Sequence, residues 1–358
     1  MFITTATSVR RTAGAAATII FAMFAGTAQA ETISVGYYSS DKHPLVSSGL
    51  INFVEEVETR TNGEITFKLF PAGQLFKPRD SVRSVAAGIA DMAQLVIPYH
   101  REEFPYSQAI NLPRGWGPWE LTNTFLRAST QDGLIRDEWE KNNLVPLVMA
   151  SNPSYEFHTI DTPLTSPADI KGMKVRSSGG LVDDVVESMG ATPINITTPE
   201  TFAALERNTI DSTIYAFSNW KGLNLQEVLG HTTLGVPLPG PSGIGFAISK
   251  AKFNALTPEQ QSILLEAGRN ASIAAQTQIL AQNVEALEEF KAGGLKTYEW
   301  SSEDIAAMTA GFGGIVATWI AAMDNNGLDG NAIVDELNAF HDAAAADPKA
   351  IPAFTAGN

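Results

Sequence analysis

The chain has 358 residues, of which 44% are hydrophobic, 18% are charged and none is cysteine. This length predicts about two domains of ordinary size, and the composition excludes disordered, collagen-like and coiled-coil chains. The absence of cysteine excludes a disulfide scaffold, a thiolate nucleophile, a cysteine zinc site and a cysteine-ligated iron–sulfur cluster. The formal net charge of −15, with no run of five basic residues, argues against nucleic-acid binding, because neutralising phosphates requires clustered cations.

Residues 1–30 have the pattern of a secretory signal peptide. Arg10 and Arg11 form a charged n-region, residues 13–26 form an apolar h-region, and Ala28-Gln29-Ala30 is an A-x-A cleavage site. The apolar run is shorter than the roughly 20 residues that a membrane span needs, so cleavage after Ala30 is favoured over an uncleaved anchor. The bulky residues expected after a twin-arginine pair are missing, which favours the general secretory route. No later segment approaches 18 apolar residues without charges, so we expect a soluble, exported mature chain.

After the signal, strand and helix patterns alternate. Strands are predicted at 32–38, 65–70, 91–97 and 144–150, and helical patterns at 44–60, 79–87 and up to about Asn142. Residues 98–120 hold four prolines and no clear period, which predicts a loop-rich region that could line a cleft. Repeated β-α-β units imply parallel strands joined by crossover helices.

A second α/β unit begins near Ser151. It is followed by a long helix, because Thr257, Pro258 and Gln260 form a cap, a first-turn proline and a capping box, and the helical pattern continues to about Lys291. At 1.5 Å per residue this helix is about 50 Å long, longer than a small domain is wide, so we expect it to brace two lobes. The strands expected after Ser151 lie at 173–177, 192–196, 210–217 and 295–299, and the other helices at 180–189, 199–207, 302–324 and 330–345.

These elements predict an α/β fold of two lobes with a long helix spanning both. Lobe I is assigned 31–150 with about 236–275 returning to it, and lobe II is assigned 151–235 with about 285–345 returning to it. Residues 346–358 form a C-terminal tail. The last helix is expected to dock on its own chain rather than to swap with a partner.

No catalytic, cofactor or metal motif is recognised. The nucleophile elbow, the Walker A lysine motif and the dinucleotide fingerprint are absent, and the five histidines have no metal-ligand spacing. One calcium-like string lies at 325–336, but its third position is glycine, so a turn and helix cap is the favoured interpretation. An exported, two-lobed chain without enzyme motifs suggests a solute receptor that closes around a small molecule. Aromatic residues that could wall its pocket are Tyr37, Tyr38, Tyr99, Trp116, Trp119, Tyr215 and Trp220.

Several segments, in order, resemble the solute receptors of tripartite ATP-independent periplasmic (TRAP) transporters, the DctP-like family. They lie at 55–63 with 70–75, at 87–93, at 168–176 with 189–193 and 203–206, and at 256–260. The resemblance implies a periplasmic receptor without enzyme activity, in which long crossing strands join two lobes around the ligand and which delivers that ligand to a membrane permease. It also implies that Arg176, in the K-x-R strand, clamps a substrate carboxylate. A planar guanidinium suits this role, because it offers two parallel charge-assisted hydrogen bonds.

Departures from the family pattern narrow the substrate. Glu156 stands where many members have a second arginine, Ser212 replaces a usual glycine, and Tyr215 stands where sialic-acid receptors have asparagine. We therefore expect a monocarboxylate with an apolar or aromatic body, in a site that also includes Tyr38, Tyr99 and Trp220. Alternatives remain open. If Glu156 faces a cationic group, the ligand is a zwitterion such as ectoine or an amino acid. The chain could also be an exported enzyme of unrecognised mechanism, the receptor of an ATP-driven importer or the ligand module of a sensor.

Overall fold

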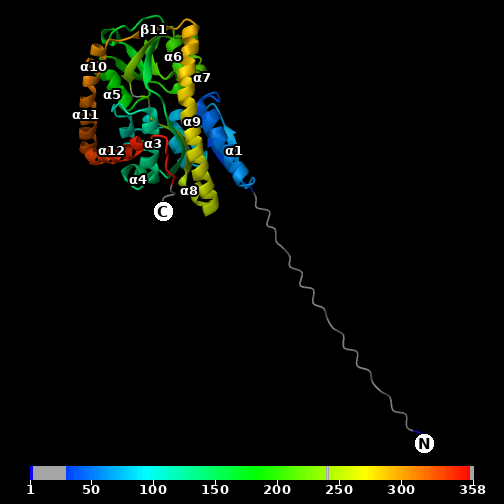
Figure 1. The fold of residues 1–358 in the computed structure, drawn as a ribbon. Helices are drawn as coiled ribbons and strands as arrows, with labels where there is room; N and C mark the ends of the chain where they lie inside the picture. Colours follow the sequence, from blue (N-terminus) through cyan, green and yellow to red (C-terminus); the bar gives the residue numbers. More distant parts are fainter. Residues whose placement is uncertain (3–29, 239, 241, 355–358) are drawn as a thin grey trace.

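The computed structural model describes residues 1–2, 30–238, 240 and 242–354 (Figure 1). Arg10, Arg11, the apolar stretch 13–26 and Ala28 of the predicted signal peptide lie outside the described residues. Among the described residues the strands form two sheets, each surrounded by helices. This arrangement agrees with the α/β, two-lobed fold expected from the sequence.

The first sheet forms lobe I and has the strand order β2-β1-β3-β10-β4. β1 pairs in parallel with β2 and β3, whereas β10 runs antiparallel to both β3 and β4. Its strands are β1 (Glu31–Gly36), β2 (Ile65–Phe70), β3 (Met92–Val96), β4 (Leu144–Ser151) and β10 (Ser242–Ser249).

The second sheet forms lobe II and has the strand order β11-β9-β5-β8-β6-β7. β5 runs antiparallel to β8 and β9, and the other pairs are parallel. Its strands are β5 (Tyr155–Thr159), β6 (Lys174–Ser177), β7 (Thr192–Asn195), β8 (Ser212–Tyr215), β9 (His231–Leu238) and β11 (Lys296–Glu299).

The helices cover both sheets. They are α1 (Ile51–Arg60), α2 (Ser81–Ala86), α3 (Pro118–Thr130), α4 (Leu134–Lys141), α5 (Leu181–Ser188), α6 (Thr201–Glu206), α7 (Trp220–Leu223), α8 (Lys250–Asn254), α9 (Pro258–Ala292), α10 (Ser302–Ala310), α11 (Phe312–Asn325) and α12 (Gly330–Ala346). A π-helical turn, η1 (Leu45–Leu50), precedes α1. Single 3₁₀ turns are η2 (Pro78–Asp80), η3 (Ile97–Tyr99), η4 (Ser107–Asn111), η5 (Pro167–Ile170), η6 (Thr198–Glu200), η7 (Phe217–Asn219) and η8 (Leu225–Glu227).

The long helix α9 spans both lobes, as its capping pattern predicts. The Gln260 backbone N–H donates to Thr257 Oγ1 over 3.3 Å, and the Thr257 N–H donates to Gln260 Oε1 over 3.1 Å, which closes the predicted capping box. α9 contacts α1, η1 and β4 in lobe I and η7 in lobe II, and it runs along the side of the whole molecule in Figure 1.

β4 is an edge strand of the first sheet, and α9 covers that edge. The N–H groups of Met149 and Ser151 donate to Ser272 Oγ over 3.0 Å and to Gln276 Oε1 over 2.8 Å. Side chains of the helix therefore satisfy backbone donors that a bare sheet edge would leave unpaired. The close approach depends on Gly268, where a Cβ atom would lie 2.4 Å from the carbonyl oxygen of Leu147.

The expectation of parallel strands is wrong for β5, β9 and β10, which the sequence pattern did not reveal. Glycine and proline weaken the strand signal in these segments: β9 contains Gly235 and Pro237, and β10 contains Gly243 and Gly245. These strands pass between the two lobes. The chain leaves β4 for β5 through Asn152–Ser154 and leaves β9 for β10 through 239–241, so both connections join lobe I to lobe II.

The last helix, α12, packs on α3 and α4 of lobe I, although the sequence assigned this segment to lobe II. Glu336 fixes the contact, because its carboxylate accepts the N–H groups of Leu134 over 2.6 Å and Ile135 over 3.1 Å. Asp329 caps α12 by accepting the N–H of Ala332 over 2.9 Å, as the turn-and-cap interpretation predicts. In the described part of the chain no group of residues could hold a metal ion.

One helical stretch contradicts the expectation about later apolar segments. Among the described residues, Ser302–Asn325 is long and apolar enough to cross a membrane, judged by length and composition alone. Only 17% of its most apolar window is buried in the molecule. The sequence estimate was wrong because small residues, rather than large apolar ones, make up much of the charge-free part of this stretch, residues 305–323.

Candidate functional site

A small cavity of about 30 Å³ lies between the two lobes and is here called the inner cavity. Lobe I contributes side chains from the ends of β1 and β3, and lobe II contributes them from β5, β6 and the turns η6 and η7. The lining residues are Tyr38, Ser39, His43, Leu45, Gln94, Val96, Tyr99, Asn152, Tyr155, Arg176, Ser178, Thr198, Asn219 and Ile244.

Arg176 is the only arginine among the described residues that line the inner cavity, and it is 1% exposed. It comes from β6, where its Nε donates to the carbonyl oxygen of Ile196 over 2.9 Å. Its Nη2 lies 3.4 Å from Tyr99 Oη, and its guanidinium carbon lies 4.3 Å from the centre of the Tyr215 ring. These contacts hold the guanidinium plane in one orientation.

Three buried polar atoms on the wall of the inner cavity have no hydrogen-bond partner within the described part of the chain. They are Arg176 Nη1, Tyr38 Oη and Ser178 Oγ. A buried donor without a partner costs roughly 1–3 kcal/mol, and more for a charged group. Such donors are satisfied when an anion with several acceptor oxygens enters, so the cavity is suited to a carboxylate.

The lining carries one positive charge at neutral pH. Burial lowers the pKa of His43 to about 4, so its imidazole is neutral and Arg176 alone is cationic. No aspartate or glutamate is present among the described residues that line the cavity. The site therefore complements a single negative charge and offers no carboxylate to a ligand cation.

A chain of polar side chains crosses the cavity wall. His43 Nε2 lies 3.2 Å from Asn219 Oδ1, and Asn219 Nδ2 donates to Asn152 Oδ1 over 3.4 Å. Gln94 Oε1 accepts the N–H groups of Tyr38 and Ser39 over 3.0 and 2.9 Å, which fixes the turn after β1. Further residues line the inner cavity without having been predicted from the sequence, among them His43, Gln94, Asn152, Tyr155, Ser178 and Asn219. Two of them could have been found. Gln94 lies in a predicted strand and Ser178 directly follows one, and polar residues near the carboxyl ends of parallel strands are candidates for a ligand site.

Tyr99 joins the two lobes at the inner cavity. It ends η3 in lobe I, and its Oη accepts the N–H of Thr198 in lobe II over 3.0 Å. The same oxygen lies 2.9 Å from Thr198 Oγ1. Because it also contacts Arg176, this hydroxyl connects the guanidinium of the inner cavity to a contact between the two lobes.

We expect Tyr99→Phe to weaken ligand binding by about tenfold, because one hydrogen bond to a buried donor contributes about 1–1.5 kcal/mol. The loss should appear mainly in a faster dissociation rate, since the change removes an interaction of the closed lobes. Stopped-flow binding would measure it. Tyr106→Phe, the same change outside the inner cavity, is the control, and equal dissociation rates in both variants would contradict this role for Tyr99.

The ring of Tyr215 packs against the guanidinium of Arg176, and Tyr215 does not line the inner cavity. Its ring faces the guanidinium, and its Oη lies 3.3 Å from Thr198 Oγ1 and 3.1 Å from Thr201 Oγ1. The structure therefore brings Arg176, Tyr38 and Tyr99 together at the cavity and places Tyr215 directly behind them.

Glu156 does not line the inner cavity, contrary to the possibility that it faces a ligand cation. Its neighbour Tyr155 lines the cavity, and consecutive strand residues point to opposite faces of the sheet. Burial raises the pKa of the carboxyl group to about 8, against the opposing effect of the backbone N–H groups of Gly235 and Val236, and its Oε2 has no hydrogen-bond partner in the described part of the chain. Glu156 thus lies next to the irregular part of β9, outside the lining of the inner cavity.

Trp220 does not line the cavity either. It is fully buried in lobe II, with its ring centre 4.9 Å from that of Phe290 and 4.7 Å from that of His158. This position does not support the prediction that Trp220 belongs to the ligand site. An aromatic side chain packs equally well in a hydrophobic core, so its residue type alone does not indicate a ligand contact.

The folded protein should lose stability between about pH 4.5 and 8, partly through Glu156. Its folded pKa of about 8 is raised from 4.5, so stability is complete below about pH 4.5 and falls as pH rises toward 8. The slope for one proton is at most about 1.4 kcal/mol per pH unit. Glu156→Gln should flatten this decline in urea titrations, although Glu138, with a pKa of about 7, keeps part of it. Identical slopes in both proteins would contradict this assignment.

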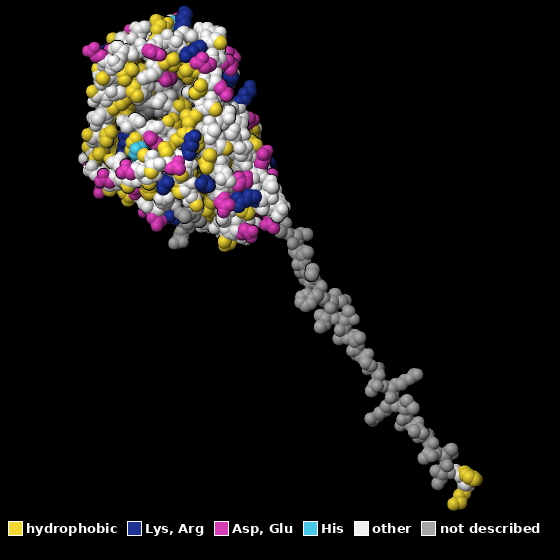
Figure 2. All heavy atoms as spheres, in the orientation of Figure 1, with side chains coloured by type: hydrophobic (Ala, Val, Ile, Leu, Met, Phe, Trp, Pro, Cys, Tyr) yellow, Lys and Arg dark blue, Asp and Glu magenta, His cyan; other side chains and the backbone are white. Residues whose placement is uncertain are grey.

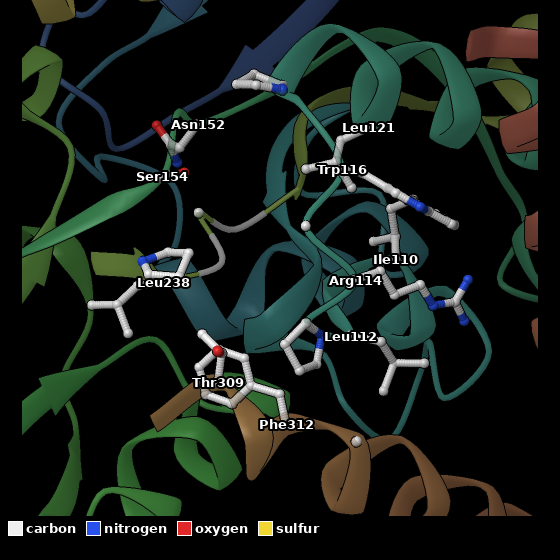
Figure 3. A pocket seen from close by; sticks show the side chains of 16 residues that line it. Ile110, Leu112, Arg114, Trp116, Leu121, Asn152, Ser154, Leu238, Thr309 and Phe312 are labelled. Carbon is white, nitrogen blue, oxygen red and sulfur yellow. The ribbon is translucent and has the colours of Figure 1, made fainter. Parts of the chain in front are cut away.

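A second, larger hollow of about 380 Å³ lies beside the chain crossings and is here called the outer pocket (Figure 3). Of the described residues, Asn152 alone lines both the outer pocket and the inner cavity. In Figure 2 the surface between the two lobes is hollowed, with hydrophobic side chains around the hollow. Arg176 does not line the outer pocket, so its guanidinium belongs to the inner cavity alone.

Comparisons with known proteins agree with this architecture. The model of the family described as "Bacterial extracellular solute-binding protein, family 7" matches residues 35–321. The "C4-dicarboxylate-binding protein DctB" of Bacillus subtilis is 26% identical over 262 residues, which are 70% of this chain and 72% of that protein.

Two solved structures share the fold. A marine metagenome TRAP solute binding protein specific for aromatic acid ligands has a TM-score of 0.79 at 23% identity and covers 87% of this chain and 99% of its own. A TRAP periplasmic solute binding protein from Bordetella bronchiseptica, with bound mandelate, has a TM-score of 0.77 at 19% identity, with coverages of 87% and 99%. All of these matches are binding proteins rather than enzymes, and the resemblance noted in the sequence is confirmed. The chain belongs to the bacterial extracellular solute-binding protein family 7, the DctP-like solute-binding proteins of TRAP transporters.

Proposed function

We propose that this protein captures a monocarboxylate with an apolar or aromatic body in the periplasm and delivers it to the membrane permease of a TRAP transporter. The observation that carries the proposal is the buried guanidinium of Arg176, whose Nη1 has no hydrogen-bond partner among the described residues. A carboxylate that enters the inner cavity satisfies this group and neutralises its charge.

The walls of the inner cavity favour a ligand with an apolar or aromatic body, which the present cavity of about 30 Å³ admits once the two lobes move apart. Side chains of Tyr38, Tyr99 and Tyr155 lie beside aliphatic groups of Leu45, Val96 and Ile244. Such walls stabilise a hydrocarbon or ring by removing it from water, and the neighbouring amides and imidazole can hydrogen-bond a hydroxyl group. The aromatic-acid and mandelate receptors described above share the fold and bind ligands of this kind.

The alternative of a zwitterionic ligand has less support. A buried ammonium group needs a carboxylate partner, and none lines the cavity among the described residues. The two lobes and the absence of a nucleophile motif likewise favour capture over turnover.

A thermal-shift panel tests the ligand class. Benzoate and mandelate represent aromatic monocarboxylates, pyruvate and glucuronate represent monocarboxylates with a small or polar body, succinate represents dicarboxylates and ectoine represents zwitterions. A ligand at 100 times its Kd adds about 2.7 kcal/mol of stability, which raises the Tm by several degrees. We expect the aromatic monocarboxylates to give the largest shifts. No shift with any acid, or a larger shift with ectoine, would overturn the proposal, and mass spectrometry of the recovered ligand would reveal any turnover.

A further inference from the structure

The outer pocket lies where three parts of the molecule meet. The segment 110–121 of lobe I forms one wall, the crossing residues Asn152 and Ser154 with Pro237 and Leu238 form a second, and α10 and α11 form a third. In Figure 3 Arg114 and Trp116 lie across the pocket from Asn152 and Leu238, with Phe312 below. Its volume of about 380 Å³ is within the range of small-molecule sites, roughly 300–1,000 Å³.

The lining of the outer pocket combines apolar and polar surface and carries one positive charge. Ile110, Leu112, Leu121, Leu238 and Phe312 supply hydrocarbon and aromatic surface. Arg114 is the one charged side chain among the described residues of the lining. A pocket with apolar walls on several sides, a few polar groups and a single cation suits molecules that combine a hydrophobic body with a negative charge.

Arg114 retains unused hydrogen-bonding capacity. Its Nη1 donates to Asn338 Oδ1 over 3.0 Å, and its guanidinium carbon lies 4.7 Å from the centre of the Trp116 ring. Its Nη2 is buried and has no hydrogen-bond partner in the described part of the chain. Burial lowers the pKa of Arg114 to about 10, so the group is still cationic at neutral pH.

We propose that the outer pocket is a second binding site, for an organic anion with an apolar body, and that its occupancy stabilises the observed arrangement of the two lobes. The site is separate from the carboxylate site of the inner cavity, because Arg176 does not line it and Arg114 does not line the inner cavity. A molecule in contact with lobe I, the crossing residues and α11 loses contacts when the lobes rotate. By linkage, it therefore favours the arrangement to which it binds.

Anilinonaphthalene sulfonate is a suitable probe, because it is an aromatic anion whose fluorescence rises in apolar surroundings. Gly313 lines the pocket, and a Cβ atom placed there meets nothing within 4 Å, so Gly313→Leu can fill the pocket without a clash. Gly314 is equally open and does not line the pocket, so Gly314→Leu is the matched control. We expect at least tenfold weaker binding in Gly313→Leu, about tenfold weaker binding in Arg114→Gln and unchanged binding in Gly314→Leu.

The Arg176→Ala variant shows whether the probe binds in the outer pocket or in the inner cavity. Unchanged probe binding in that variant supports the proposal, whereas loss of probe binding there with full binding in Gly313→Leu would place the probe in the inner cavity and overturn it. Absence of binding at millimolar probe would also overturn it. Amide hydrogen exchange tests the effect on the lobes: exchange in Asn152–Ser154 should slow at least threefold with probe in the wild type but not in Gly313→Leu. Unchanged exchange would refute the proposed stabilisation of the lobes.

Discussion

Replacing Arg176 with alanine should weaken ligand binding by about 100- to 1,000-fold, or more. The guanidinium contributes charge-assisted hydrogen bonds of about 1.5–3 kcal/mol each, and a carboxylate left without it in a closed cavity costs roughly 3–5 kcal/mol. At about 1.4 kcal/mol per decade, these energies give the expected loss. Isothermal titration calorimetry with the acid that gives the largest thermal shift would measure it.

Two further variants show whether the loss of affinity comes from the contact between the Arg176 guanidinium and the ligand carboxylate. Arg176→Lys should recover only part of the affinity, because lysine keeps the charge but lacks the planar pair of donors that Ile196 and Tyr99 now hold in place. Arg207→Ala removes an exposed arginine after α6 in the same lobe and should leave binding unchanged. Wild-type affinity in Arg176→Ala would move the anion site elsewhere and remove the main support for an acidic ligand.

The elements that the sequence predicted well are those with strong local signals. The helix expected from Thr257 to about Lys291 is α9, and the strand expected at 65–70 is β2. The capping box at Thr257–Gln260, and the Asn62-Gly63 pair that separates α1 from β2, are read from a few neighbouring residues, so no tertiary information is needed. β5, β9 and β10 differ, because antiparallel partners far away in the chain determine their pairing, and glycines or prolines in β9 and β10 also obscure the pattern.

The inner cavity could be predicted only in part for a similar reason. Arg176, Tyr38 and Tyr99 lie in or directly after predicted strands or in a loop that follows one, whereas His43 and Asn219 reach the cavity through turns. His43 lies just before η1 and Asn219 ends η7, and both η1 and η7 contact α9, so the position of these side chains depends on how the long helix packs. That packing is not a property of the local sequence.

Trp220 and Glu156 show the limits of residue type as evidence. Trp220 is as aromatic as Tyr99, yet it lies in the core of lobe II, because an aromatic ring is stabilised equally by core or ligand contacts. Glu156 follows Tyr155 in the same strand and therefore points to the opposite face of the sheet. A one-residue offset thus separates a side chain that lines the cavity from one that does not.

The packing of α9 on β4 predicts a large loss of stability from Gly268→Ala. The new Cβ atom would lie 2.4 Å from the Leu147 carbonyl oxygen and 3.0 Å from its carbonyl carbon, and these are backbone atoms that cannot rotate away. The helix must move outward, which stretches the hydrogen bonds from Met149 and Ser151 to Ser272 and Gln276. Overpacking of this kind costs about 1–3 kcal/mol, and a weakened pair of buried hydrogen bonds adds to it. We expect a loss of about 3 kcal/mol in the free energy of unfolding, measured by urea denaturation.

The same substitution at Gly314 should change the free energy of unfolding in the opposite direction. The comparison separates the effect of the clash from the general effect of adding a methyl group to a helix. Gly314 lies in α11 with nothing within 4 Å of a Cβ atom, so alanine there reduces the freedom of the unfolded chain without a clash. We expect Gly314→Ala to be within about 0.5 kcal/mol of the wild type, on the stabilising side. Because α9 contacts both lobes, Gly268→Ala should also lower ligand affinity, whereas Gly314→Ala should not. Equal stability of the two variants would show that α9 can move away from β4 at no cost, and would contradict its role as a rigid brace.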